Sequence, residues 1–84
     1  DMSDLASYDD LAARQQGFWL TEGPNSEGQA GWMLCDGVMY SFGGEWASGP
    51  RLGESLPVAQ FLERYASSTN PRVLVIVNEL RARR

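Results

Sequence analysis

Few side chains in this sequence could perform catalysis. It contains no His and no Lys, its seven basic residues are all Arg, and its one thiol belongs to Cys35. Groups for general base work, Schiff-base chemistry or zinc ligation are therefore missing. Cys35 precedes a tight turn and does not open a helix, so nothing local activates its thiol. We expect neither a metal site nor a cofactor site.

Carboxylates remain as candidates for acid–base work. The available ones are Asp9, Asp10, Glu45 and Glu54. Their spacing selects no pair, and Asp9-Asp10 fits the negative charge that the start of a helix favours. The glycine-rich stretches 22–31 and 43–55 lack the phosphate-loop and dinucleotide fingerprints. We therefore expect no catalytic residues and no enzyme.

Residue types common at binding surfaces gather in stretch 43–55. Trp46 lies among glycines, with Glu45 and Arg51 close by in the sequence. Trp and Arg are the types most enriched at binding hot spots, and loops carry function more often than the scaffold does. The alternative is that Trp46 folds back and covers the core. We predict Trp46, Arg51 and Glu45 as contacts to a protein partner.

The stretch WMLCDGVMYSF, residues 32–42, is apolar on both sides of Asp36-Gly37. That dipeptide favours a two-residue type I′ hairpin, because both central positions need positive φ. Side chains alternate between the faces of a strand, so a hairpin that met water should have one polar face. Here both faces need cover. The expected opposite pairs are Cys35 with Val38, Met33 with Tyr40 and Gly31 with Phe42 on one face, and Leu34 with Met39 and Trp32 with Ser41 on the other.

Helical signals lie on both sides of this hairpin. Ser7, or alternatively Ser3, is predicted to cap a first helix that runs to about Gln16. Ser55 is predicted to cap a second helix, residues 56–66, that ends before Asn70-Pro71. The apolar stripe of the second helix consists of Val58, Phe61, Leu62 and Tyr65.

Two further segments are predicted as strands. Phe18–Thr21 follows the first helix, and Val73–Val77 is too apolar for a strand with one wet face, so it is expected at the centre of the sheet. The terminal NELRARR is either a short helix or a frayed basic tail. The predicted fold is a small single α+β domain of order α-β-β-β-α-β, with a mostly antiparallel sheet packed by two helices. It is expected to span residues 2–84, with Asp1 a remnant of a cleaved tag.

The cover of the second hairpin face has two alternatives. A first helix that presents Leu5, Tyr8, Leu11 and Ala12 could cover it, which gives three closed layers. If both helices instead pack on one side, an open patch remains that contains Trp32, Leu34, Met39 and Trp19. This patch would be a dimer or partner interface, and on this basis Trp32, Met39 and Trp19 are further candidate contacts.

Charge is distributed unevenly along the chain. Residues 1–42 hold seven acids and one Arg, net -6, whereas residues 43–84 hold four acids and six Arg, net +2. A total of -4 without a basic stripe argues against direct nucleic-acid binding. No apolar segment is long enough to cross a membrane and no signal peptide is recognisable. Arg without Lys indicates a GC-rich genome, and we expect a protein of the bacterial cytoplasm, encoded by the bacterium or by a phage.

These observations favour a non-enzymatic protein-binding module. We expect an inhibitor from a phage or bacterium, such as an anti-defence or immunity protein, that blocks a larger protein by occupying its surface. One alternative is a homodimeric accessory or scaffold subunit that associates through the apolar hairpin face. A second is an acidic decoy that occupies a nucleic-acid site on another protein.

Overall fold

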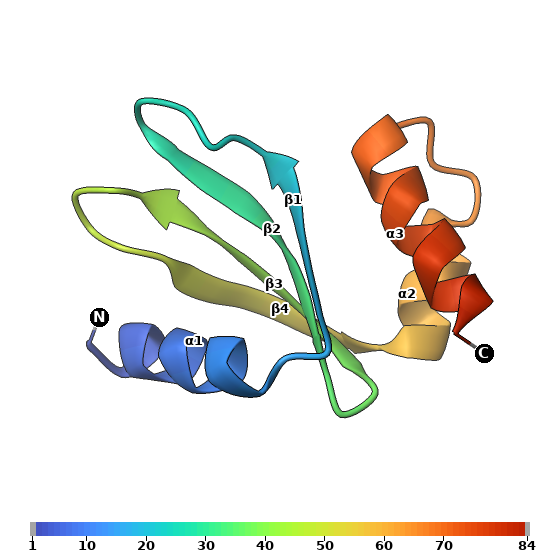
Figure 1. The fold of residues 1–84 in the computed structure, drawn as a ribbon, viewed down its shortest axis with the longest axis horizontal. Coiled ribbons are helices and arrows are strands. Elements are labelled where there is room, and N and C mark those ends of the chain that lie inside the picture. The colour runs from blue at the N-terminus through green and yellow to red at the C-terminus, as the bar shows by residue number, and fades with distance from the viewer. Residues whose placement is uncertain (1, 84) are drawn as a thin grey trace.

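The chain folds into a four-stranded antiparallel sheet between helices (Figure 1). This computed structural model describes the backbone of residues 2–83 and the side chains of residues 7–83. The elements are α1 (Met2–Arg14), β1 (Gly17–Glu22), β2 (Gly28–Cys35), β3 (Val38–Glu45), β4 (Arg51–Pro57), α2 (Val58–Tyr65) and α3 (Pro71–Ala82). The predicted α+β class is confirmed, while the order of the elements is α-β-β-β-β-α-α.

The central hairpin is the one that its turn residues predict. Asp36 and Gly37 have φ values of 50° and 79°, the positive values that a type I′ turn requires. All five predicted opposite pairs occur between β2 and β3. Because a shift of one residue would exchange the faces, this turn decides which side chains each layer of helices must cover.

Both faces of the hairpin are covered, so the three-layer alternative is confirmed. In Figure 1, α1 lies on one side of the sheet and α2 with α3 on the other. The cluster on the α1 side contains Leu11, Met33, Cys35 and Phe42, with Tyr8 and Ala12 of α1 packed against it. The cluster on the other side contains Trp32, Leu34, Met39, Leu56, Phe61, Leu62, Val73, Ile76, Val77 and Leu80. The predicted contribution of Leu5 lies outside the described side chains.

The prediction of a central strand at Val73–Val77 is wrong, because these residues belong to α3. Asn70 caps this helix by accepting a hydrogen bond from the backbone N–H of Arg72 (3.0 Å), and Pro71 occupies its first turn. The buried residues are Val73, Ile76, Val77 and Leu80, which follow helical spacing. Asn70-Pro71 therefore begins a helix as well as ending the segment before it. Of the two readings of NELRARR, the helical one holds through Ala82.

The sequence prediction also missed β4, which occupies the end of the presumed loop 43–55. Its register with β3 slips between Tyr40 and Phe42, so that two β4 residues face Ser41. The Ser41 hydroxyl fills the gap by accepting a hydrogen bond from the backbone N–H of Glu54 (2.7 Å). Because glycine, proline and this bulge interrupt the strand, β4 lacks the alternation by which strands are recognised in a sequence.

Helix boundaries differ from the predicted ones for local reasons. Helix α1 begins at Met2, so Ser7 lies inside it and caps nothing; no Gly or Pro interrupts the segment ahead of Ser7. The helix ends at Arg14, because the backbone N–H of Gln16 already bonds the carbonyl of Leu34 (2.8 Å). Helix α2 begins at Val58 with Pro57 at its cap position, since Ser55 still pairs with Tyr40 in the sheet.

Within the described part of the chain, no helix is both long and apolar enough to cross a membrane.

Replacement of Met39 by Ala tests the assignment of the core. Met39 is fully buried, so Met39→Ala should lower the free energy of unfolding by about 2–5 kcal/mol through lost burial and the cavity left behind. Urea denaturation followed by circular dichroism measures this change. Val75→Ala is the control: this side chain is 51% exposed on α3, and its loss should change stability by less than about 0.5 kcal/mol. Equal effects of the two substitutions would contradict the assignment.

Candidate functional site

The two ends of the sheet differ in construction. At the hairpin end lie the β2–β3 turn, the junction between α1 and β1, and the start of α2, whose first backbone N–H bonds the carbonyl of Gly37 (3.1 Å). At the opposite end, the loop end, lie the loops between β1 and β2 and between β3 and β4 (Figure 1). Two helices contact the hairpin end directly, whereas the loop end is joined to α3 by a hydrogen bond from the Arg72 guanidinium to the carbonyl of Gly23 (3.0 Å).

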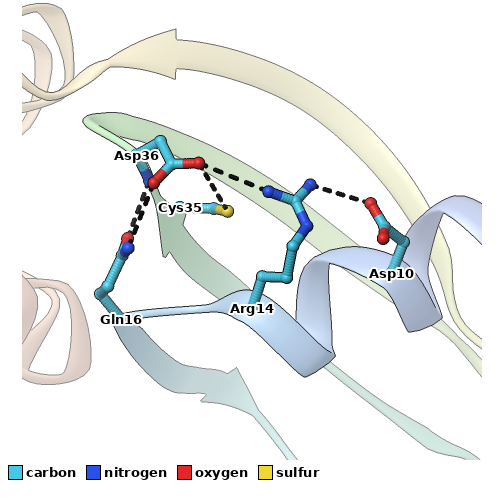
Figure 2. A network of polar contacts seen from close by, with 5 residues as sticks. All are labelled: Asp10, Arg14, Gln16, Cys35 and Asp36. Atoms are coloured by element: carbon cyan, nitrogen blue, oxygen red, sulfur yellow. Dashed lines mark hydrogen bonds and ion pairs between the residues drawn. The ribbon is translucent and has the colours of Figure 1, made fainter.

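Arg14 and Gln16 join α1 to the hairpin turn in a polar network (Figure 2). The Arg14 guanidinium donates to Asp10 Oδ2 at 2.8 Å and to Asp36 Oδ2 at 3.4 Å. Gln16 Oε1 accepts from the backbone N–H of Asp36 at 2.8 Å, while its Nε2 donates to Asp36 Oδ1 at 3.2 Å. Two side chains that follow each other closely in the sequence thus hold Asp36 from both its backbone and its carboxylate.

This network positions α1 on the hairpin turn. The hydrogen bond and positive charge of Arg14 lower the pKa of Asp10 below its usual value. Asp10 and Asp36 are both exposed, and Cys35, whose Sγ lies 3.8 Å from Asp36 Oδ2, is buried beneath them. A thiol closed off by α1 cannot meet a substrate in this conformation.

At the loop end, Asn25 and Trp46 connect the two loops. Asn25 Oδ1 accepts hydrogen bonds from the backbone N–H groups of Glu27 (2.8 Å) and Gly28 (3.0 Å), which closes the turn after β1. Trp46 donates twice to this turn, from its indole Nε1 to the carbonyl of Asn25 (2.7 Å) and from its backbone N–H to the carbonyl of Glu27 (2.9 Å). The indole ring is therefore held in place by the neighbouring loop.

The close contact of the two loops depends on glycine. A Cβ atom at Gly28 would collide with the carbonyl oxygen of Gly44, so only glycine allows the backbones to approach this closely. Gly49, with φ of 80°, closes the second loop by donating its N–H to the carbonyl of Glu45 (2.8 Å). The glycines near Trp46 thus fix the conformation of the loops that carry it.

Although it is held in this way, Trp46 is 53% exposed. It lines a hollow of about 450 Å³, which we call the loop-end surface, formed by Ser26, Glu27, Glu45, Trp46 and Ala47. A second hollow of about 200 Å³ adjoins it and shares Glu27 and Glu45, with Glu22 on its border. An exposed aromatic ring and several carboxylates therefore share one end of the sheet.

The structure brings together two of the six predicted contact residues. Trp46 and Glu45 lie on the loop-end surface, and Arg51 is exposed nearby, where β4 starts opposite Gly43. The alternative that Trp46 covers the core is wrong, because its ring rests on the β1–β2 loop and belongs to neither core cluster.

Trp32, Met39 and Trp19 lie elsewhere. Trp32 and Met39 are 7% and 0% exposed beneath α2 and α3, so the prediction that they form an open patch is wrong. Trp19 is half-buried against α3, where its Nε1 donates to Glu79 Oε2 at 2.5 Å and Arg83 lies over its ring at 5.6 Å. The open-patch alternative left this face of the sheet bare, but α2 and α3 cover it. Trp19, Trp32 and Met39 therefore pack the helices against the sheet.

The carboxylates considered for acid–base work are dispersed. Asp10 pairs with Arg14, and Glu54 forms two hydrogen bonds with the Arg64 guanidinium at 2.9 and 3.0 Å. Asp9 lies on α1 and Glu45 at the loop end. No group of three His, Cys, Asp or Glu side chains among residues 7–83 is arranged to hold a metal ion.

Sequence reasoning missed Asn25 and Glu27 as parts of the candidate site. The segment Pro24-Asn25-Ser26 carried a signal, since Asn in a turn commonly bonds the backbone two residues later. That signal predicts a turn, but only the fold shows that this turn holds Trp46, which lies 21 residues further along the chain.

Comparisons with protein-family models, with curated proteins and with solved structures gave no match for this chain.

The network at the hairpin end can be tested through the thiol it encloses. Arg14→Gln removes the ion pairs of Arg14 with Asp10 and Asp36, so α1 should open more often and Cys35 should react several-fold faster with an aromatic disulfide reagent under native conditions. Arg81→Gln, on the last turn of α3, is the matched control and should leave the rate unchanged. An unchanged rate in Arg14→Gln would show that apolar packing alone holds the helix.

The same ion pair predicts a pH dependence. The pKa of Asp10 is lower in the folded chain than its usual value of 3.8, so the Asp10–Arg14 contribution to stability is present at neutral pH and is lost as the pH falls through that lowered pKa. A carboxyl-carbon NMR titration should give Asp10 a pKa below 3.8 in the wild type and a higher pKa in Arg14→Gln. Identical titrations would mean that the pair does not persist in solution.

Proposed function

We propose that this protein is a non-enzymatic protein-binding module whose contact surface is the loop-end surface, with Trp46 at its centre. In this proposal it is an inhibitor from a phage or bacterium that acts in the bacterial cytoplasm, where it blocks a larger protein by occupying part of its surface. The observation that supports it is that Trp46 is more than half exposed and yet held by two hydrogen bonds to the neighbouring loop.

The exposed part of the Trp46 ring is apolar surface that a partner could bury. If a partner covered the exposed part of the indole, on the order of 100 Å² would leave water, which corresponds to about 2–3 kcal/mol. That magnitude is typical of a binding hot spot. The Asn25 carbonyl holds the indole Nε1 and the Glu27 carbonyl holds the backbone of Trp46, so little conformational entropy would be lost when a partner covers the ring.

The burial of the hairpin removes the basis of the homodimer alternative. That alternative required one bare hairpin face, and α1 covers one face while α2 and α3 cover the other. Self-association would have to use a different surface. The acidic decoy differs from our proposal in mechanism, since its binding would depend on total charge and not on one aromatic ring.

Trp46→Ala provides the test. Wild-type protein immobilised on a resin and exposed to bacterial lysate should retain a partner. Trp46→Ala should bind this partner at least about 30-fold more weakly, a factor that corresponds to about 2 kcal/mol. The free energy of unfolding should fall by about 1–3 kcal/mol, for the lost hydrogen bond to Asn25 and for the part of the ring that is covered in the folded chain. Quantitative mass spectrometry of the retained proteins and urea denaturation measure the two effects.

Two further variants separate contact from scaffold. Trp46→Phe keeps an aromatic ring but loses the indole donor, so it should bind better than Trp46→Ala. Val75→Ala removes an exposed apolar side chain on α3 and should bind as the wild type does. Loss of binding in Val75→Ala, or full binding by Trp46→Ala, would refute the loop end as the contact surface.

A further inference from the structure

The loop end is acidic as well as aromatic. Segments 22–28 and 43–50 together contain three glutamates, Glu22, Glu27 and Glu45, and no basic residue, and Arg51 follows the second segment directly at the start of β4. Among the described residues none of these carboxylates forms an ion pair, whereas Asp10 and Asp36 pair with Arg14 and Glu54 pairs with Arg64. Arg72 reaches the β1–β2 loop but donates to the carbonyl of Gly23 (3.0 Å) and not to a carboxylate.

We infer that the loop-end surface recognises an arginine in a basic segment of its protein partner, an inference that rests on the proposed function. The guanidinium lies over the exposed indole of Trp46 and pairs with the carboxylates of Glu27 and Glu45, which line the same hollow. A planar cation that stacks on indole and forms paired hydrogen bonds with carboxylates matches this combination better than an ammonium does.

The loop contacts keep the ring and the carboxylates in register. Trp46 bonds the carbonyl of Glu27 through its own backbone, and Glu45 precedes it directly, so the backbone positions of both acids are tied to that of the ring. The hollow is open to solvent, so a guanidinium can approach the ring and both carboxylates from outside. A purely apolar partner would cover the ring of Trp46 but would leave the carboxylates of Glu27 and Glu45 without a cation. The carboxylates therefore favour a basic partner.

The inference is tested with a defined probe. We would titrate the isotope-labelled protein with a nine-residue peptide of alternating Gly and Arg and follow the Trp46 indole N–H and Gly28 amide signals by NMR. These signals should shift with the arginine peptide, shift less with its lysine counterpart, and stay in place with a peptide in which citrulline replaces each Arg. Binding should weaken strongly in high salt.

Charge variants locate the binding. The double substitution Glu27→Gln and Glu45→Gln should weaken peptide binding at least tenfold, and Trp46→Ala should weaken it as well. Glu63→Gln, which removes an exposed acid on α2, is the matched control and should bind as the wild type does. Equal binding of the citrulline peptide, no peptide binding at all, or unchanged binding by the double variant overturns the inference.

The same variants in the lysate experiment separate this inference from the proposed function. If Trp46→Ala loses capture but the double glutamine variant keeps it, the loop-end surface binds a protein without recognising an arginine. In that case only the inference fails. If Trp46→Ala and the double glutamine variant both capture the partner as the wild type does, the proposed function fails. If Trp46→Ala and the double glutamine variant both lose capture, the proposed function and the inference both stand.

Discussion

The constraint on which this fold depends is a hairpin that is apolar on both faces. Met33 and Met39, on opposite sides of the β2–β3 hairpin, are both completely buried. A sheet with one wet face needs a single layer of helices, whereas this hairpin must be enclosed from both sides. All three helices serve that need, since α1 contributes to one cluster and α2 with α3 to the other.

This constraint also determines where a function can lie. The polar network around Asp36 and the start of α2 both secure the hairpin end, and Trp19 is committed to α3. At the loop end, the hydrogen bonds of Trp46 hold the two loops together, and Trp46 belongs to neither core cluster. Trp46 can therefore stay exposed at the loop end, because the core does not depend on its burial. The same reasoning explains why Trp32, an equally attractive contact by residue type, is structural.

The sequence predicts this protein well where the signal is local. Asp36-Gly37 determines a turn, the turn determines the register, and the register determines the two faces of the hairpin, so five pairs were predictable without any long-range information. Prediction fails where a segment depends on distant partners. Strand β4 exists because β3 offers it an edge and Ser41 fills its bulge, and neither is visible in residues 51–57 alone. For the candidate site, Trp46 and Glu45 follow from residue type, while Asn25 and Glu27 do not.

The amino-acid sequence by itself determined the α+β class, the central hairpin, the absence of His and Lys, and a glycine-rich stretch that carries Trp46 and Glu45. Tertiary structure alone decided that Val73–Val77 is helical, because a short apolar run satisfies a buried strand and a buried helix equally well until packing against Phe61 and the sheet selects one. It also decided which Trp is exposed. Burial is a property of the neighbours that a side chain meets, and for Trp19, Trp32 and Trp46 those neighbours come from distant parts of the chain.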